Sequence, residues 1–156
     1  FYIGMKDLYL FHKKMLKPEI IWNIEKGMNL TIEKIALAEN QRLRIFNNMN
    51  NFFKNYDLII CPTTIVPPFP IEQRYLKECE GQKFETYIDW LNIVSAITLS
   101  LCPALSLPAG FTEDKLPLSI QIIAPNKKEG KLLSGSAFIE KVINLKNYLP
   151  ISPIEK

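Results

Sequence analysis

The only histidine of this chain, His12, is the first side chain to consider for acid–base chemistry. It lies beside Lys13 and Lys14 within a stretch whose apolar spacing predicts a helix. A catalytic histidine needs a partner that orients it and a group to which it transfers a proton, and no partner is visible here. A solvent-exposed surface position is therefore favoured over catalysis.

Two adjacent threonines are stronger candidates for ligand contact. Thr63 and Thr64 follow the apolar run 57–61, which is dense in isoleucine and predicts a buried strand. Open α/β sheets bind ligands beyond the ends of their strands. Threonines beside Pro62 fit a turn equally well, with their hydroxyls bonded to the backbone. Both interpretations stay open.

The composition excludes several classes of function. The chain has 156 residues, of which 47% are hydrophobic and 22% charged, as in an ordinary globular domain. Its net charge of +3 is spread without a basic block, which argues against nucleic-acid binding. No apolar run approaches the roughly 20 residues that span a bilayer, so no membrane segment is expected. Neither a cofactor nor a metal site is predicted.

The three cysteines, Cys61, Cys79 and Cys102, form no C-x-x-C pair and lie in or beside apolar segments. Cys61 and Cys102 have no neighbour in sequence that would stabilise a thiolate, so inert buried thiols are favoured over reactive ones. Free thiols are typical of a reducing compartment, and a cytoplasmic location is expected.

Periodicity and punctuation predict an α/β chain. The apolar residues at helical spacing predict helices over 1–17, 18–27, 31–54, 85–100 and 126–147. Strands are predicted over 57–61, 104–108 and 118–124, the last two joined by a surface turn. Gly27 is predicted to follow a helix end, Thr31 and Asn126 are predicted N-caps, and residues 71–83 are predicted to form a loop with a short helical turn. The tail 148–156 is predicted to be loose.

The stretch 101–125, LCPALSLPAGFTEDKLPLSIQIIAP, resembles the carboxy-terminal signature of the amidase signature family. The upstream run 56–63, YDLIICPT, and the later helix with Glu129, Leu132 and Leu133 resemble the family in the same order. The resemblance implies a mixed β-sheet flanked by helices. Leu101, Lys115 and Ser119 stand where family members commonly have glycine, and a lysine held at positive φ costs about 1–2 kcal/mol.

Members of this family hydrolyse carboxamides with a serine nucleophile, a second serine and a lysine base, all in their amino-terminal part. Nothing in this chain resembles that glycine- and serine-rich loop, since Ser134, Gly135 and Ser136 lie in a predicted helix without flanking glycines. The resemblance therefore predicts that residues 1–156 are a fragment, the carboxy-terminal part of an amidase domain, with no catalytic residue of its own.

The resemblance also implies which residues contact the substrate. The helix before Pro103 presents one face to the acyl pocket in this family, which indicates Ile88, Leu91 and Ser95. From periodicity alone, the same three residues fit the protein core better. Asp89 and Trp90 fit a polar handle and an aromatic wall, but a helix at the rim of a site commonly carries such residues.

The expected partners are a small-molecule amide substrate in the full-length protein and the missing amino-terminal amidase part; a homo-oligomer is left open. The alternatives are a non-catalytic truncated product, a partner subunit, or part of an amidotransferase A-type subunit that works on charged tRNA.

Overall fold

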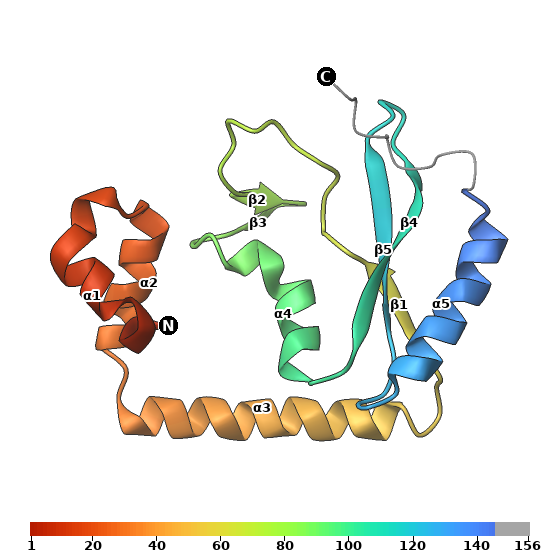
Figure 1. The fold of residues 1–156 in the computed structure, drawn as a ribbon, viewed down its shortest axis with the longest axis horizontal. Helices are drawn as coiled ribbons and strands as arrows, with labels where there is room; N and C mark the ends of the chain where they lie inside the picture. Colours follow the sequence, from red (N-terminus) through yellow and green to blue (C-terminus); the bar gives the residue numbers. More distant parts are fainter. Residues whose placement is uncertain (146–156) are drawn as a thin grey trace. The chain divides into compact units, whose positions relative to one another are not determined.

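A computed structural model describes residues 1–145, and it divides the chain into two units whose boundary falls within helix α3 (Ile32–Phe52; Figure 1). The first unit is Phe1–Leu43, and the second begins at Arg44. The tail predicted for 148–156 lies outside the described residues.

The first unit contains a helical hairpin. Helix α1 (Tyr2–His12) leads through the short 3₁₀ helix η1 (Lys13–Met15) into α2 (Pro18–Met28). Proline occupies the start of α2, as predicted, because its missing N–H would have no helical partner at that position. The predicted role of Gly27 is wrong, because α2 continues through Met28. A Cβ on Gly27 would lie 2.8 Å from the Tyr2 Cβ, so glycine permits the close contact of α1 with α2.

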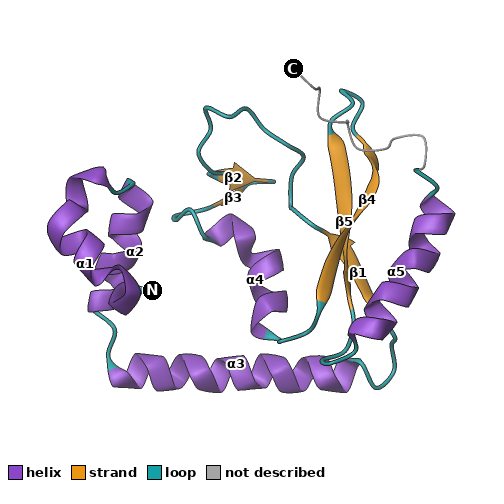
Figure 2. Cartoon of the chain, in the orientation of Figure 1, coloured by secondary structure: helices purple, strands orange, loops and turns teal. Residues whose placement is uncertain are grey.

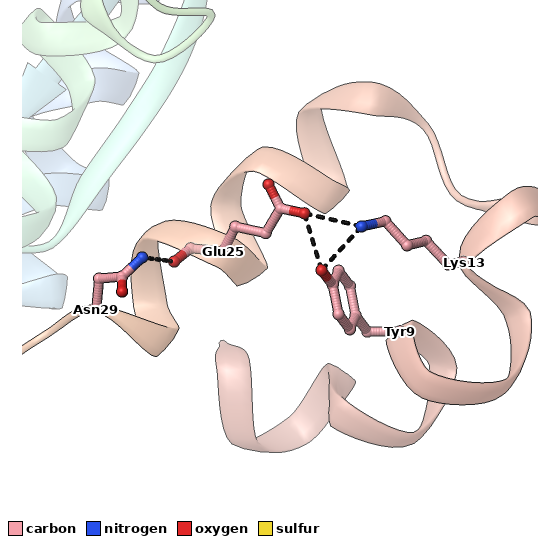
Figure 3. A network of polar contacts seen from close by, with 4 residues as sticks. All are labelled: Tyr9, Lys13, Glu25 and Asn29. Atoms are coloured by element: carbon pink, nitrogen blue, oxygen red, sulfur yellow. Dashed lines mark hydrogen bonds and ion pairs between the residues drawn. The ribbon is translucent and has the colours of Figure 1, made fainter.

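A polar cluster joins the two helices of this hairpin (Figure 3). The Tyr9 hydroxyl donates to Glu25 Oε1 at 2.8 Å, and Lys13 Nζ donates to both of these oxygens at 2.9 Å. Hydrogen bonds from Lys13 and then Tyr9 lower the pKa of the Glu25 carboxyl. Hydrogen bonds to Tyr9 and then Glu25 raise the pKa of Lys13. Asn29 Nδ2 also donates to the Glu25 carbonyl, at 2.9 Å.

Helix α3 (Ile32–Phe52) begins as predicted. The Thr31 hydroxyl accepts a hydrogen bond from the Lys34 N–H at 3.3 Å, which confirms Thr31 as the N-cap. The pKa of Glu33, in the first turn, is lowered by its own backbone N–H and by the Thr31 hydroxyl. Although its sequence is amphipathic, α3 has no buried residue within the described part of the chain.

The second unit is built on a three-stranded antiparallel sheet of order β1-β5-β4 (Figures 1 and 2). Its strands are β1 (Ile59–Pro62), β4 (Ala104–Phe111) and β5 (Pro117–Ile123). Helix α5 (Glu129–Ile143) packs on one face, where Leu107, Ile122, Ala124 and Leu132 form the core. The predicted α/β class is confirmed.

Two details of the strand predictions are wrong. The run 57–61 is not a buried strand, because β1 lies at the edge of the described sheet and Ile60 is 54% exposed. Strand β4 is longer than predicted and continues past Pro108. Its ladder shifts register between Pro108 and Gly110, which accommodates the missing N–H.

Two of the three positions where glycine was expected have unusual backbone. Lys115, in the turn between β4 and β5, has φ 62°, and Leu101, just after helix α4 (Asn92–Leu99), has φ 59°. The turn is held by the Lys115 N–H, which donates to the Thr112 carbonyl at 2.9 Å, and by the Leu116 N–H, which donates to Thr112 Oγ1 at 3.0 Å. Side chains with a Cβ rarely adopt such angles, so both positions store strain.

The segment between β1 and β4 differs most from the prediction. Residues 71–83 begin with a single turn, in which the Gln73 N–H donates to the Pro70 carbonyl at 3.0 Å. They end in an unpredicted small hairpin of β2 (Glu78–Cys79) and β3 (Gln82–Lys83), with Glu80 and Gly81 at positive φ. The helix predicted from residue 85 begins later, as the 3₁₀ helix η2 (Asp89–Leu91) followed by α4 (Asn92–Leu99).

Helix α5 begins three residues after its predicted N-cap. Asn126 does not cap it, because its side-chain amide donates to the Leu101 carbonyl. Lys128 occupies the N-cap position without a side-chain hydrogen bond. The helix ends at Ile143 with Asn144 in the left-handed conformation, a common way of ending a helix.

Candidate functional site

A depression lies where β1 ends and its chain leaves the sheet. The Thr63 N–H donates to the Ser119 carbonyl at 3.3 Å, which carries the pairing with β5 one residue past β1. The chain then leaves the ladder through a bend at residues 63–66 and continues into the proline-rich segment. The resulting depression has a volume of about 520 Å³. It is lined by Pro62, Thr63, Thr64, Ile65, Val66, Pro67, Pro68, Ala109, Pro117, Leu118, Ser119 and Ile120.

The two predicted threonines both line this depression, with different contacts. Thr64 Oγ1 donates to the Val66 carbonyl at 2.8 Å, which is the turn contact expected as the alternative. Thr63 Oγ1 lies 3.5 Å from Ser106 Oγ on β4, and either hydroxyl can be the donor. Of the two hydroxyls, that of Thr63 is the better placed to exchange its partner for a ligand, since its contact is the longer.

A row of polar side chains across the sheet face opposite α5 was missed. Cys61, Gln121 and Ser106 stand at paired positions on β1, β5 and β4. Gln121 is only 6% exposed, and its amide donates to Cys61 Sγ at 3.5 Å. The alternation of β5 shows that Gln121 shares a face with Ser119, but only the register shows which residues flank it.

Ile88, Leu91 and Ser95 do not line the depression. All three are half-buried, but they lie on different elements: Ile88 precedes η2, Leu91 ends it, and Ser95 belongs to α4. Ile88 and Leu91 are linked by a hydrogen bond from the Leu91 N–H to the Ile88 carbonyl at 2.9 Å, and Leu91 is the N-cap of α4. Their contact with substrate stays a prediction.

The start of η2 explains Asp89 and Trp90 structurally. Asp89 Oδ2 accepts a hydrogen bond from the Thr86 N–H at 2.8 Å, which caps the turn. Hydrogen bonds from the Thr86 backbone and then its side chain lower the pKa of Asp89. The Trp90 ring packs edge-on against Phe69, with 5.8 Å between centroids. This aromatic contact ties η2 to the proline-rich segment beside the depression.

The side chains considered for catalysis or metal binding lie in surroundings that indicate structural roles. Ser134 Oγ donates to the Gly130 carbonyl at 2.8 Å within α5. A Cβ on Gly135 would lie 2.5 Å from Leu58 Cδ1, so this glycine brings α5 close to the chain entering β1. His12 is exposed at the end of α1. The three cysteines are free thiols, and the described residues contain no cluster of side chains that could hold a metal ion.

The sheet and the helix packed on it define the class as an α/β protein, with a candidate ligand site in the depression at the end of β1. The model of the Amidase family matches residues 5–133, so the chain belongs to this family.

The similar proteins include both simple amidases and amidotransferase components. The A-type subunit of the glutamyl-tRNA(Gln) amidotransferase of Alkaliphilus metalliredigens is 30% identical over 70% of this chain and 21% of its own length. An acylamidase of Rhodococcus erythropolis is 31% identical over 76% of this chain and 25% of its own length. The chain thus spans about a fifth to a quarter of these relatives.

The solved structures agree on the fold. A bacterial aryl acylamidase of the amidase signature family superposes with a TM-score of 0.83 at 20% identity, over 94% of this chain and 32% of that chain. The A-type subunit of the glutamyl-tRNA(Gln) amidotransferase from Thermotoga maritima superposes with a TM-score of 0.64 at 25% identity, over 84% of this chain and 27% of that chain.

Proposed function

We propose that this chain is the substrate-facing, carboxy-terminal part of a carboxamide hydrolase, and that the nucleophile and base come from the amino-terminal amidase part. The family match over residues 5–133 carries the proposal. Hydrolysis of an amide by a serine enzyme needs a base beside the nucleophile and donors for the oxyanion. The surroundings of Ser134 and Ser136 provide neither, since both lie within α5.

In this proposal, Thr63 and Thr64 contact the substrate at the strand end, and Ile88, Leu91 and Ser95 contribute to a wall completed by the amino-terminal part. The large exposed apolar side chains support a partner of that kind. Within the described residues they include Ile35 and Leu43 on α3 and Leu133, Phe138 and Val142 on α5. Apolar exposure on this scale marks interaction surfaces.

Because these apolar side chains are exposed, we also expect the isolated chain to self-associate. The outer edges of β1 and β4 carry unpaired backbone groups in the described sheet, and such edges pair readily with other chains. Sedimentation of the purified chain over a range of concentrations should show oligomers. A compact monomer that stays stable at high concentration would contradict this.

A cytoplasmic location completes the proposal, supported by three free thiols. Among residues 1–145, no helix is long and apolar enough to cross a bilayer.

The decisive experiment compares the product of the complete reading frame with the 156-residue chain. The complete product should hydrolyse aliphatic or aryl amides and react with a serine-directed fluorophosphonate. The chain alone should do neither. Stoichiometric labelling of a serine within the chain would overturn the assignment of the catalytic groups to another part of the protein.

An amidotransferase A-type subunit is the second candidate, favoured by the similarity to the Alkaliphilus protein. An assay for transfer of ammonia to glutamyl-tRNA(Gln), with free amides as competing substrates, distinguishes the two. Transfer that requires additional subunits would favour the second candidate.

A further inference from the structure

We propose that the depression beside Thr63 takes the uncharged, apolar group of a small amide and discriminates against charged groups; this rests on the proposed function. None of its lining residues carries a charge. Apart from Thr63, Thr64 and Ser119, the lining consists of aliphatic side chains, prolines and an alanine. A carboxylate or ammonium placed there would lose hydration without gaining a countercharge, and uncompensated burial of a charge is strongly unfavourable.

The size of the depression fits a small ligand. Its volume of about 520 Å³ falls within the range of roughly 300–1,000 Å³ typical of small-molecule sites. One wall is the proline-rich segment, whose backbone torsions are restricted by its prolines. The other is the paired backbone of β4 and β5, around Ala109 and Leu118. Walls of restricted mobility lose little conformational entropy when a ligand binds.

The hydroxyl of Thr63 gives the depression one polar end. It lies 3.5 Å from Ser106 Oγ, a long contact that a carbonyl oxygen of the ligand can replace. The Thr64 hydroxyl is held by the Val66 carbonyl at 2.8 Å and is therefore less available. Thr63 is thus the residue that sets the orientation of a neutral amide.

The test uses two ligands that differ only in a charged substituent, benzamide and 4-carbamoylbenzoate. Saturation-transfer NMR is applied to each in the presence of the 156-residue chain, and because it observes the ligand, it tolerates self-association of the protein. Benzamide should bind at least roughly tenfold more tightly than the carboxylate, since the carboxylate must be desolvated without a partner. Equal or tighter binding of the carboxylate, or no binding of benzamide, overturns the proposal.

Two lysine substitutions locate the binding. Leu118→Lys places a cation in the lining. It should weaken the binding of benzamide and strengthen the binding of 4-carbamoylbenzoate. Ile71→Lys, at a position that is 93% exposed and outside the lining, is the matched control and should change the binding of neither ligand. Thr63→Val, which keeps the shape but removes the hydroxyl, should weaken benzamide severalfold. Equal effects of the two lysine variants would show that the ligand binds elsewhere and overturn the proposal.

Failure of this inference is distinguishable from failure of the proposed function. If the complete product hydrolyses amides with charged and neutral acyl groups equally well, the ligand class is wrong and the function stands. If it hydrolyses no amide while benzamide still binds at Leu118, the function is wrong and the ligand class stands.

Discussion

The strained backbone at Leu101 provides a quantitative test of the structure. Its φ of 59° is held from both sides. The Ser100 hydroxyl accepts a hydrogen bond from the Cys102 N–H at 3.3 Å, and the Asn126 amide donates to the Leu101 carbonyl. A non-glycine residue in this conformation costs about 1–2 kcal/mol. Glycine removes that cost but loses roughly 0.5–1 kcal/mol more conformational entropy on folding.

Two substitutions separate the strain from the packing. The Leu101 side chain is 54% exposed, so removing it forfeits about half of the roughly 1.5–3 kcal/mol of a fully buried leucine, or roughly 1 kcal/mol. Leu101→Ala incurs this loss and keeps the strain, whereas Leu101→Gly incurs it and relieves the strain. The glycine variant should therefore exceed the alanine variant by about 0.5–1 kcal/mol in free energy of unfolding, although it has the smaller side chain.

Urea denaturation followed by circular dichroism measures this difference. If the free energy of unfolding falls by about 2 kcal/mol per molar urea, the midpoint of the glycine variant should lie about 0.3–0.5 M above that of the alanine variant. Both variants are measured at the same protein concentration, because self-association makes the midpoint depend on concentration. Lys115 has φ 62° and is exposed, so substitutions there repeat the test without loss of buried apolar surface. The free energy of unfolding of Lys115→Gly should exceed that of Lys115→Ala by a similar amount. Alanine variants as stable as the glycine variants would refute the assignment of strain.

Three further perturbations test the packing and the polar cluster. Ser136 is 3% exposed, and its hydroxyl has no hydrogen-bond partner in the described structure. Ser136→Ala should therefore raise the free energy of unfolding by about 1 kcal/mol, and the control Ser134→Ala should change it less. Gly27→Ala should destabilise by about 1–3 kcal/mol in thermal unfolding because of the contact with Tyr2, whereas Gly4→Ala, whose added Cβ meets open space, should not destabilise. The lowered pKa of Glu25 means that its stabilising contribution is present above its ordinary pKa of 4.5 and is lost as the pH falls through the lower folded value. Glu25→Gln should therefore flatten the acid limb of the urea midpoint against pH, and an unchanged limb would contradict this assignment.

The order and type of most elements could be predicted because the signals are local. Pro18 and Thr31 start helices for reasons contained in their own side chains, and the alternating residues of β5 define its two faces. Lys115 and Leu101 stand where the family commonly has glycine, and both have positive φ. The family was also accessible from sequence, because its motifs are continuous stretches of the chain.

What the sequence by itself could not determine depends on which segments meet in space. Thr63 was a candidate, but its contact with Ser106 depends on the pairing of both β1 and β4 with β5, residues far apart in the chain. The helix predicted from residue 85 begins later, where Asp89 Oδ2 accepts a hydrogen bond from the Thr86 N–H. Asn126 had the residue type of an N-cap, yet its amide donates to the Leu101 carbonyl. Local chemistry therefore determined the elements and the family. The surroundings of the candidate site depend on the strand register and on competition for hydrogen-bond partners, and only the tertiary structure decides these.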